Sequence, residues 1–240
     1  MKKFNLMLTI LTLAFTTISC GPSTVVERLQ KDLDRHPEYS IILEDMREEG
    51  FFFSDYFHKY KIVRGEKADN DSIAYHSEIT DWYEVEKKEY QKYQPYLGMT
   101  LASKSADGNI SDTPQPPGYQ YVGDSRYGQW RTDSNGNSFW EWYGKFALMS
   151  HVFGMFGGGS IFRNDWNDYR RYQSNGRPYY GKNRQYGTSG SYTKKSNPNF
   201  FQRRQTRETS RKQSFSDRVK QRTRRSNMSS VRRRSGGFGK

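Results

Sequence analysis

The scarcity of branched aliphatic side chains limits how this chain can fold more than any other feature. Leucine, isoleucine, valine and phenylalanine make up 42 of its 240 residues, which is below the roughly 20% at which highly charged chains tend to be disordered. The last leucine is Leu148 and the last isoleucine is Ile161. Ordering the backbone of each residue costs about 1–2 kcal/mol, and burial of apolar surface must offset it. We therefore place the folded part at residues 24–165 and expect residues 166–240 to form a largely disordered, low-complexity segment rich in Arg, Tyr, Ser and Gly.

Net charge divides the chain in a similar way. Residues 21–100 contain 17 acidic and 11 basic residues, a net charge of −6, whereas residues 181–240 contain 18 basic and 2 acidic residues, a net charge of +16. The formal net charge of +13 is therefore a property of the C-terminal segment. A flexible segment with this excess of positive charge attracts anionic groups, and salt screens the attraction.

The first element expected in the folded part is an amphipathic helix. Thr24-Val25-Val26-Glu27 has the spacing of a capping box, in which a threonine and a glutamate satisfy each other's free backbone N–H groups. Apolar residues then recur at helical intervals as far as Leu33, and His36-Pro37 ends the pattern.

Strands and further helical segments follow. Residues 39–46 and 51–63 are rich in β-branched and aromatic residues and are predicted to be strands. Residues 81–93 are predicted to be a helix, and residues 102–118, which contain three prolines, a loop. The predicted fold class is α+β: a small domain with an N-terminal helix and short antiparallel strands, followed by the long disordered basic tail.

The clearest local signal is a hairpin within the stretch GQWRTDSNGNSFWEWYG. Asn135-Gly136 lies between two aromatic-rich runs, and both residue types accept the positive φ of a two-residue hairpin turn. Such a turn pairs residues whose numbers sum to about 271, a register that a bulge would change. It places two sets of side chains on opposite faces: Trp130, Phe139, Glu141 and Tyr143 on one, and Arg131, Trp140 and Trp142 on the other. Residues 146–156 are expected to form a short helix or apolar turn.

The N-terminus has the pattern of an export signal. Met1-Lys2-Lys3 is cationic, and residues 4–19 are mainly apolar. These 16 residues are fewer than the ~20 that a helix needs to cross a bilayer. A charged start, a short apolar run and small residues at its end are typical of a signal peptide, here residues 1–19.

The end of this signal resembles the lipobox of bacterial prelipoproteins. The resemblance rests on Thr17-Ile18-Ser19-Cys20, which includes the single cysteine of the chain, although Thr17 stands where leucine is usual. It implies that Cys20 is diacylated, for example with palmitate, and becomes the N-terminus of the mature protein after cleavage, with residues 20–23 as a linker. Gly21 in place of aspartate favours the outer over the inner membrane by the enterobacterial sorting rule. The alternative interpretation is an ordinary secretory signal that happens to contain a cysteine.

The sequence contains no pattern that predicts catalysis, so we expect neither an enzyme nor a cofactor. The four histidines are scattered, and a single cysteine cannot build a zinc cluster. The stretch FGGGSIF lacks the order of a nucleophile elbow. We therefore expect no catalytic, cofactor or metal residues.

The basic segment carries the main functional hypothesis. In an exported, lipid-anchored protein its partners would be anionic lipid, lipopolysaccharide or an acidic protein. Arginines interleaved with tyrosines also suit nucleic acid, but export makes that partner unlikely. A segment that only keeps the protein soluble is a further alternative. The candidate anion-binding residues are Arg203, Arg204, Arg211, Lys212, Arg222, Arg224, Arg225, Arg232, Arg233 and Arg234.

A second hypothesis comes from the tryptophans. Trp130, Trp140 and Trp142 would form an aromatic platform if exposed, as a glycan- or peptidoglycan-binding module needs. The competing interpretation, which we favour, is that these rings form the core in place of the missing aliphatic side chains. The sequence therefore predicts a membrane-anchored cell-envelope lipoprotein with a structural or interaction role, with a glycan-binding module as the alternative.

Overall fold

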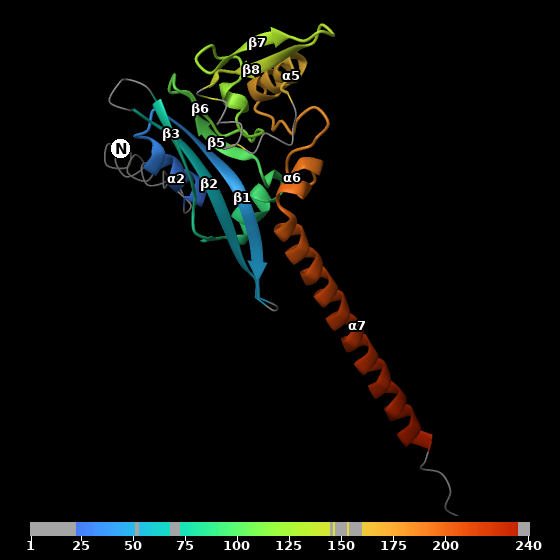
Figure 1. The fold of residues 1–240 in the computed structure, drawn as a ribbon. Helices are drawn as coiled ribbons and strands as arrows, with labels where there is room; N and C mark the ends of the chain where they lie inside the picture. The colour runs from blue at the N-terminus through green and yellow to red at the C-terminus, as the bar shows by residue number, and fades with distance from the viewer. Residues whose placement is uncertain are drawn as a thin grey trace, which may run out of the picture.

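The computed structural model describes the backbone of residues 23–50, 53–67, 73–144, 146, 153 and 160–234, and side chains as far as residue 223. The signal segment 1–19 and Cys20 lie outside the described residues, as does most of segment 146–156. The fold is α+β, as predicted: an antiparallel sheet with helices packed around it, and one long helix that projects from the body (Figure 1).

The predicted N-terminal helix is present as α2 (Val25–Leu33). Thr24 is its N-cap, and both hydrogen bonds of the capping box form between Thr24 and Glu27. The four apolar residues of the pattern, Val25, Val26, Leu29 and Leu33, are all buried. The helical period of the sequence thus becomes one apolar face that packs on the sheet.

Within the described residues the main sheet has the strand order β3-β2-β1-β5-β6, and β4 pairs with β2. The bounds of these strands are β1 (Glu38–Glu49), β2 (Asp55–Lys67), β3 (Ile73–Ile79), β4 (Tyr83–Val85), β5 (Thr100–Lys104) and β6 (Ile110–Ser111). The two predicted strands correspond to β1 and β2, and both extend further toward the C-terminus than expected. Gly50, with φ 82°, follows β1 in a left-handed conformation that glycine adopts without strain.

The sheet separates two apolar clusters, because successive residues of a strand point to opposite faces. Tyr39, Ile41 and Leu43 of β1 pack with α2 in the first cluster. Ile42 and Val63 belong to the second cluster, which is built mainly from aromatic rings of residues 119–179.

Two local predictions are wrong in part. The helix expected over residues 81–93 is only α3 (Lys87–Tyr93), followed by the 3-10 turn η1 (Gln94–Tyr96). The preceding residues form β4, because the unpaired edge of β2 offers Tyr83 and Val85 backbone partners. The loop expected over residues 102–118 is interrupted by the end of β5 and by β6, which pair with each other.

The Asn-Gly hairpin exists as β7 (Gly128–Thr132) and β8 (Ser138–Trp142), but its register differs from the prediction by one residue. Trp130 pairs with Trp140, so the paired numbers sum to 270 instead of 271. The Asp133 N–H donates to the Asn137 carbonyl, and Gly136 has φ 81°, which is the geometry of a longer turn with a glycine bulge. Trp130, Trp140 and Trp142 therefore share one face.

The structure also differs from the expected boundary at residue 165. Three helices lie beyond or across it: α5 (Arg163–Ser174), α6 (Ser191–Ser196) and α7 (Pro198–Arg234). Tyr179, Tyr186 and Phe200 are buried in this region. Counting aliphatic residues missed this order because one aromatic ring buries more surface than a leucine side chain does.

Candidate functional site

Helix α7 is the element that presents most of the candidate anion-binding residues. Pro198 is its first residue, a position where the missing N–H is not needed and the fixed φ suits the helix. The hydroxyls of Thr206 and Thr209 donate to carbonyls one turn earlier, which satisfies them within the helix. The helix contains 37 residues and is therefore about 55 Å long. Among the described residues, its first turns make the contacts to the body, and the helix then projects from it (Figure 1).

The base of α7 is fixed first by apolar contacts. Phe200 is 5% exposed and belongs to the cluster beneath the sheet, and Phe201 packs against that cluster. The Asn197 side-chain amide, just before the helix, donates to the Glu44 carbonyl of β1 at 2.7 Å. These contacts set the position at which the helix leaves the body.

A row of ion pairs then holds α7 against β1. Arg203 donates to both carboxylate oxygens of Asp45 at 2.6 and 2.7 Å. Arg207 and Arg211 both donate to Glu48, at 2.8 and 2.9 Å. The three arginines are spaced by four residues, so they lie on one face of the helix. We call this set of five side chains the arginine joint.

Electrostatics of the arginine joint favour ionised Glu48. Burial alone would raise the pKa of Glu48, but hydrogen bonding from Ser54 and the charges of Arg207 and Arg211 outweigh burial and lower it. The Arg207 guanidinium also donates to the Gly50 carbonyl at 2.9 Å. Arg207 therefore binds both a side chain and the backbone at the end of β1.

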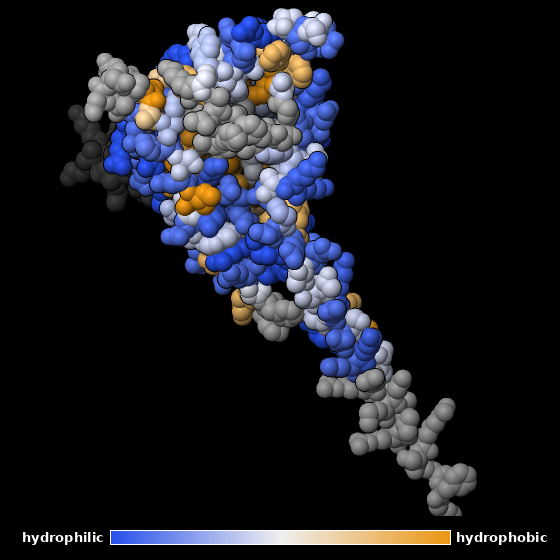
Figure 2. Space-filling model, viewed as in Figure 1, coloured by the Kyte–Doolittle hydropathy of each residue, from blue (hydrophilic) through white to orange (hydrophobic). Residues whose placement is uncertain are grey.

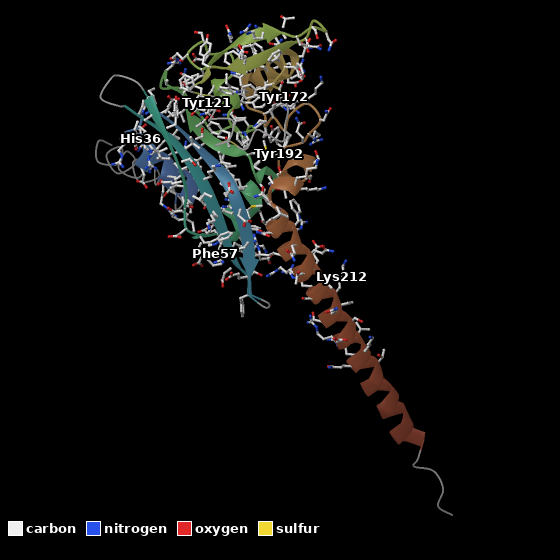
Figure 3. The ribbon with its side chains drawn as sticks, in the orientation of Figure 1. His36, Phe57, Tyr121, Tyr172, Tyr192 and Lys212 are labelled. Carbon is white, nitrogen blue, oxygen red and sulfur yellow. The ribbon has the colours of Figure 1, made fainter. Side chains whose placement is uncertain are left out.

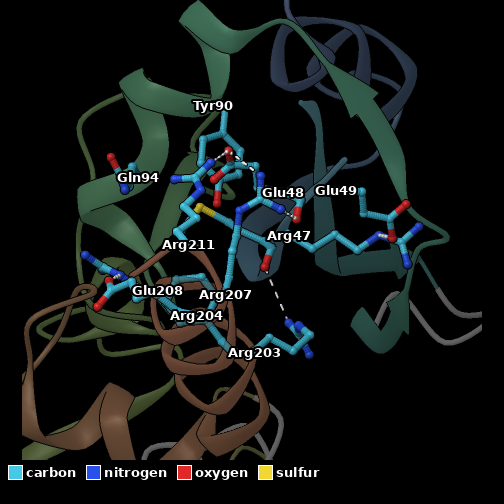
Figure 4. Close-up of a pocket in the computed structure, with 12 residues that line it drawn as sticks. Arg47, Glu48, Glu49, Tyr90, Gln94, Arg203, Arg204, Arg207, Glu208 and Arg211 are labelled. Atoms are coloured by element: carbon cyan, nitrogen blue, oxygen red, sulfur yellow. Dashed lines mark hydrogen bonds and ion pairs between the residues drawn. The ribbon is translucent and has the colours of Figure 1, made fainter. Parts of the chain in front are cut away.

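A groove of about 370 Å³ lies between α7 and β1 at this joint (Figure 4). Met46, Tyr90 and Phe200 contribute its apolar lining, and five arginines contribute its charge. Each guanidinium already has a carboxylate partner: Arg47 with Glu49, Arg203 with Asp45, Arg204 with Glu208, and Arg207 and Arg211 with Glu48. Because Glu48 is shared by two arginines, the five guanidinium groups meet four carboxylates, and the groove keeps a single excess positive charge.

Beyond the joint, α7 presents cations to solvent. Lys212, Lys220 and Arg222 are exposed and make no ion pair among the described residues (Figure 3 labels Lys212). Phe215 and Val219, one turn apart, are 66% and 45% exposed. The described surface of this part is otherwise mainly hydrophilic (Figure 2). At about 100° per residue, Lys212 and Arg222 flank the Phe215–Val219 stripe on the same side of the helix.

The ten candidate anion-binding residues therefore fall into three groups. Arg203, Arg204 and Arg211 are paired with carboxylates, and Lys212 and Arg222 are exposed. The backbone of the other five, Arg224, Arg225, Arg232, Arg233 and Arg234, belongs to α7, and their side chains lie outside the described part.

The three tryptophans of the candidate platform pack against one another. The ring centroids of Trp130 and Trp140 are 5.1 Å apart, and those of Trp140 and Trp142 are 6.1 Å apart. Trp166 of α5 adds a fourth ring 5.5 Å from Trp130, and its indole N–H donates to the Val122 carbonyl. Trp140 is 5% exposed, so its faces are covered. Trp140 belongs to the second core cluster, as the favoured interpretation expected, and Trp130, Trp142 and Trp166 are partly buried against that cluster.

Arg131, expected opposite Trp140, instead faces Glu141 and pairs with it at 2.7 Å. In this register Arg131 lies on the other face of the hairpin from Trp140, so it makes no cation–π contact with that ring. Arg163 of α5 provides such a contact with Trp130, with the guanidinium 4.2 Å from the ring centroid.

The histidines within the described residues do not form a metal site. His58 is buried, contacts the Tyr60 hydroxyl at 3.0 Å through Nδ1, and stacks on Tyr90. Burial lowers the pKa of His58 to about 4, so it is neutral at pH 7. In the part of the chain that the structure describes, no three His, Cys, Asp or Glu residues are grouped so as to hold a metal ion.

A further candidate site, which the sequence prediction missed, lies in the segment expected to be disordered. Tyrosines and arginines of residues 168–184 line a cavity beside α5. The alternation of Arg and Tyr in DYRRYQSNGRPYYGKNRQYG was the available signal. The low aliphatic content of this segment led us to predict disorder, but buried tyrosine rings take the place of aliphatic side chains in its core.

Searches against models of known protein families, curated proteins and solved structures found no match. Over the residues that the structure describes, no helix combines the length and apolar character that crossing a membrane demands.

Proposed function

We propose that this chain is a lipid-anchored cell-envelope protein with a structural or interaction role, attached through Cys20, whose helix α7 binds the anionic headgroups of a lipid surface. The observation that carries the proposal is the surface of α7 beyond the arginine joint. There, exposed Phe215 and Val219 lie beside cations that have no carboxylate partner among the described residues.

This pattern suits an anionic membrane surface. Apolar side chains on one side of a helix enter the boundary between headgroups and acyl chains, while long cationic side chains reach the phosphates. Each Lys or Arg near such a surface contributes about 1 kcal/mol. Lipopolysaccharide presents the same phosphate chemistry as an anionic phospholipid.

Attachment at Cys20 would make the interaction of α7 with lipid more effective. Thr24, the N-cap of α2, is four residues from Cys20, so at most about 14 Å of chain separates them. The body, and α7 with it, would be held close to the lipid surface, which raises the local concentration of headgroups. A lipid chain together with a basic patch is a combination that gives stable anchoring.

The anchor is tested by mass. We expect the intact mass of the membrane-extracted protein to correspond to a chain beginning at residue 20 and carrying acyl groups, and the Cys20→Ala variant to lack them. A native protein that retains Met1 and stays in the soluble fraction would contradict the anchor.

The role of α7 is tested separately with the unlipidated chain of residues 21–240. We expect it to co-sediment with phosphatidylglycerol-containing vesicles at low salt, and much less with neutral phosphatidylcholine vesicles or at high salt. The double variant Lys212→Glu, Arg222→Glu should weaken binding at least about tenfold. Lys87→Glu, Lys88→Glu on α3 makes the same change in net charge on the body and should have little effect.

Equal sedimentation with neutral and anionic vesicles would contradict the proposal for α7. So would an equal loss in both double variants, since binding would then depend on overall charge and not on the helix. Binding to soluble polyglutamate but not to vesicles would assign α7 to an acidic protein partner instead.

A further inference from the structure

A cavity of about 610 Å³ lies between the C-terminal part of α5, the segment 177–184 and Tyr96 of η1. Its volume is within the roughly 300–1,000 Å³ typical of small-molecule sites. Tyr172, which lines it, is labelled beside α5 in Figure 3. The cavity is distinct from the groove at the arginine joint, and the two share no lining residue.

The cavity is cationic. Its lining includes four cationic side chains and one carboxylate, that of Asp168. Arg171 pairs with Asp168 at 2.8 Å, and Lys182 lies 3.7 Å from Asp165. Arg177 and Arg184 are exposed and make no ion pair within the described residues. Two guanidinium groups are therefore available to a ligand, and each offers the fork of donors that matches a carboxylate.

Phenol hydroxyls supply neutral hydrogen-bonding groups. Burial is the main cause that raises the pKa of Tyr180 to about 12, so its hydroxyl is protonated at pH 7. Tyr179 is 3% exposed, and its hydroxyl has no hydrogen-bond partner in the described part of the chain. This hydroxyl is covered within the aromatic cluster, so the other tyrosines of the lining, Tyr96, Tyr172 and Tyr180, supply the hydroxyls for a ligand.

The backbone at the cavity is also unusual. Arg184 has φ 51° and is the non-glycine residue with positive φ among the described residues. Glycine or asparagine occupies this conformation more easily, and a strained non-glycine residue tends to be kept where its side chain is used. Here the turn directs the chain so that Arg184 lines the cavity.

We propose that this cavity binds a carboxylated sugar. A ligand that matches this lining carries an anionic group, which binds Arg177 and Arg184. It also carries hydroxyl groups, which form hydrogen bonds with the tyrosine hydroxyls. Nucleobases would need open aromatic faces for stacking. The guanidinium groups instead lie over the rings, Arg177 at 5.8 Å from the Tyr172 centroid and Arg184 at 5.6 Å from that of Tyr180. The cavity therefore recognises its ligand by hydrogen bonds and charge.

The test uses the chain of residues 21–240 and two ligands that differ only at C6: methyl β-glucuronide, which carries a carboxylate, and methyl β-glucoside, which carries a hydroxymethyl group. Ligand titrations followed by NMR should show binding of the glucuronide at least about tenfold tighter than that of the glucoside. Arg177→Gln and Arg184→Gly should each weaken glucuronide binding by a similar factor. Arg184→Gly should do so without lowering the melting temperature, because glycine relieves the positive φ.

The matched control is Arg170→Gln. Arg170 is an exposed arginine of α5 whose guanidinium lies over Trp166, outside the cavity lining. It should leave glucuronide binding unchanged. Equal affinity for the two glycosides, an equal loss in Arg170→Gln, or tighter binding of adenosine monophosphate than of the glucuronide would each overturn the proposal. None of these results depends on α7 or on Cys20.

Discussion

Trp140 lies between two other indole rings, and Gly128 of the paired strand approaches it closely. A Cβ placed on Gly128 would lie 2.8 Å from the Trp140 ring, so glycine at this position allows the indole to lie flat against the strand. At the scale of single residues, aromatic rings and the small residues that admit them replace the leucines of an ordinary core.

Replacing Trp140 with alanine should therefore lower the free energy of unfolding by about 3–5 kcal/mol, because a large buried ring leaves a cavity. Denaturation in urea measures the change. Tyr143→Ala is the control, since Tyr143 is partly exposed at the end of the same hairpin, and it should lower stability by less than about 1 kcal/mol. Folding of Trp140→Ala with unchanged stability would show that the ring is not core.

Glu38 is a residue whose ionisation opposes folding. Its side chain is buried and accepts hydrogen bonds from the hydroxyls of Tyr75 and Tyr127, at 2.7 and 3.0 Å. Burial raises the pKa of Glu38, and the two hydrogen bonds only partly offset it. The folded state therefore holds the proton to a higher pH than the unfolded state does, and this residue's contribution to stability falls as pH rises above about 4.5.

Glu38→Gln removes this titration. We expect the variant to gain stability relative to the natural chain as pH rises from about 4 to about 7, since only the natural chain must ionise a buried group. Urea denaturation of both proteins at several pH values gives the difference. A difference that stays constant across this range would mean that Glu38 titrates as it does in the unfolded chain.

At the scale of elements, periodic patterns were the reliable part of the sequence. The apolar period and capping box of α2 predict a helix, and the structure contains it with its apolar face packed on the sheet. Tyr83 and Val85 carry no such period, and pairing with β2 decides their conformation. The hairpin turn was located correctly, but the bulge at Gly136 that sets its register depends on one φ angle that the dipeptide Asn-Gly does not determine.

The sequence predicts the basic composition of the candidate site on α7, but it does not predict which carboxylates its arginines pair with. The sequence identifies α7 as basic, but it does not show that Arg203 and Arg211 face Asp45 and Glu48 across more than 150 residues of chain. Long-range pairs of this kind are set by tertiary packing. The same applies to the tyrosine and arginine cavity, whose wall combines Tyr96 with residues of α5 and segment 177–184.

The geometry of the arginine joint predicts that replacing Glu48 loosens helix α7 locally. Glu48→Ala removes the partner of both Arg207 and Arg211. Each partly exposed ion pair contributes roughly 0.2–1 kcal/mol, so hydrogen exchange in residues 203–211 should become several-fold faster. Glu49→Ala is the matched control, because the neighbouring Glu49 pairs with Arg47 of its own strand and, among the described residues, with no arginine of α7. Equal exchange in both variants would show that the pairs do not hold the helix.

At the scale of the whole molecule, residues 166–211 are part of the folded body or held against it. Tyr179 belongs to the aromatic cluster on one face of the sheet, and Phe200 belongs to the cluster on the other. Both clusters therefore depend on residues beyond 165, although charge and aliphatic content divide the sequence near that point.

Truncation distinguishes this arrangement from the one expected from composition. A chain of residues 21–211 should unfold cooperatively with a melting temperature close to that of residues 21–240, because it keeps the clusters and the arginine joint. A chain of residues 21–165 should lose cooperative unfolding, since removal of several buried rings withdraws about 1.5–3 kcal/mol for each. Calorimetry measures both. Cooperative unfolding of residues 21–165 at the same temperature would show that the folded domain ends near residue 165, as the composition predicts.

The arginine joint holds α7 near its N-terminal end. The gripped turns, residues 200–211, span about 18 Å, whereas residues 212–234 form an arm of about 35 Å. The tip lies about 51 Å from Phe200, whereas the Arg211–Glu48 pair lies about 17 Å from it. A sideways force on the tip is therefore multiplied roughly threefold at that pair. A partner that displaced the tip would therefore load the end of β1, and through it the sheet.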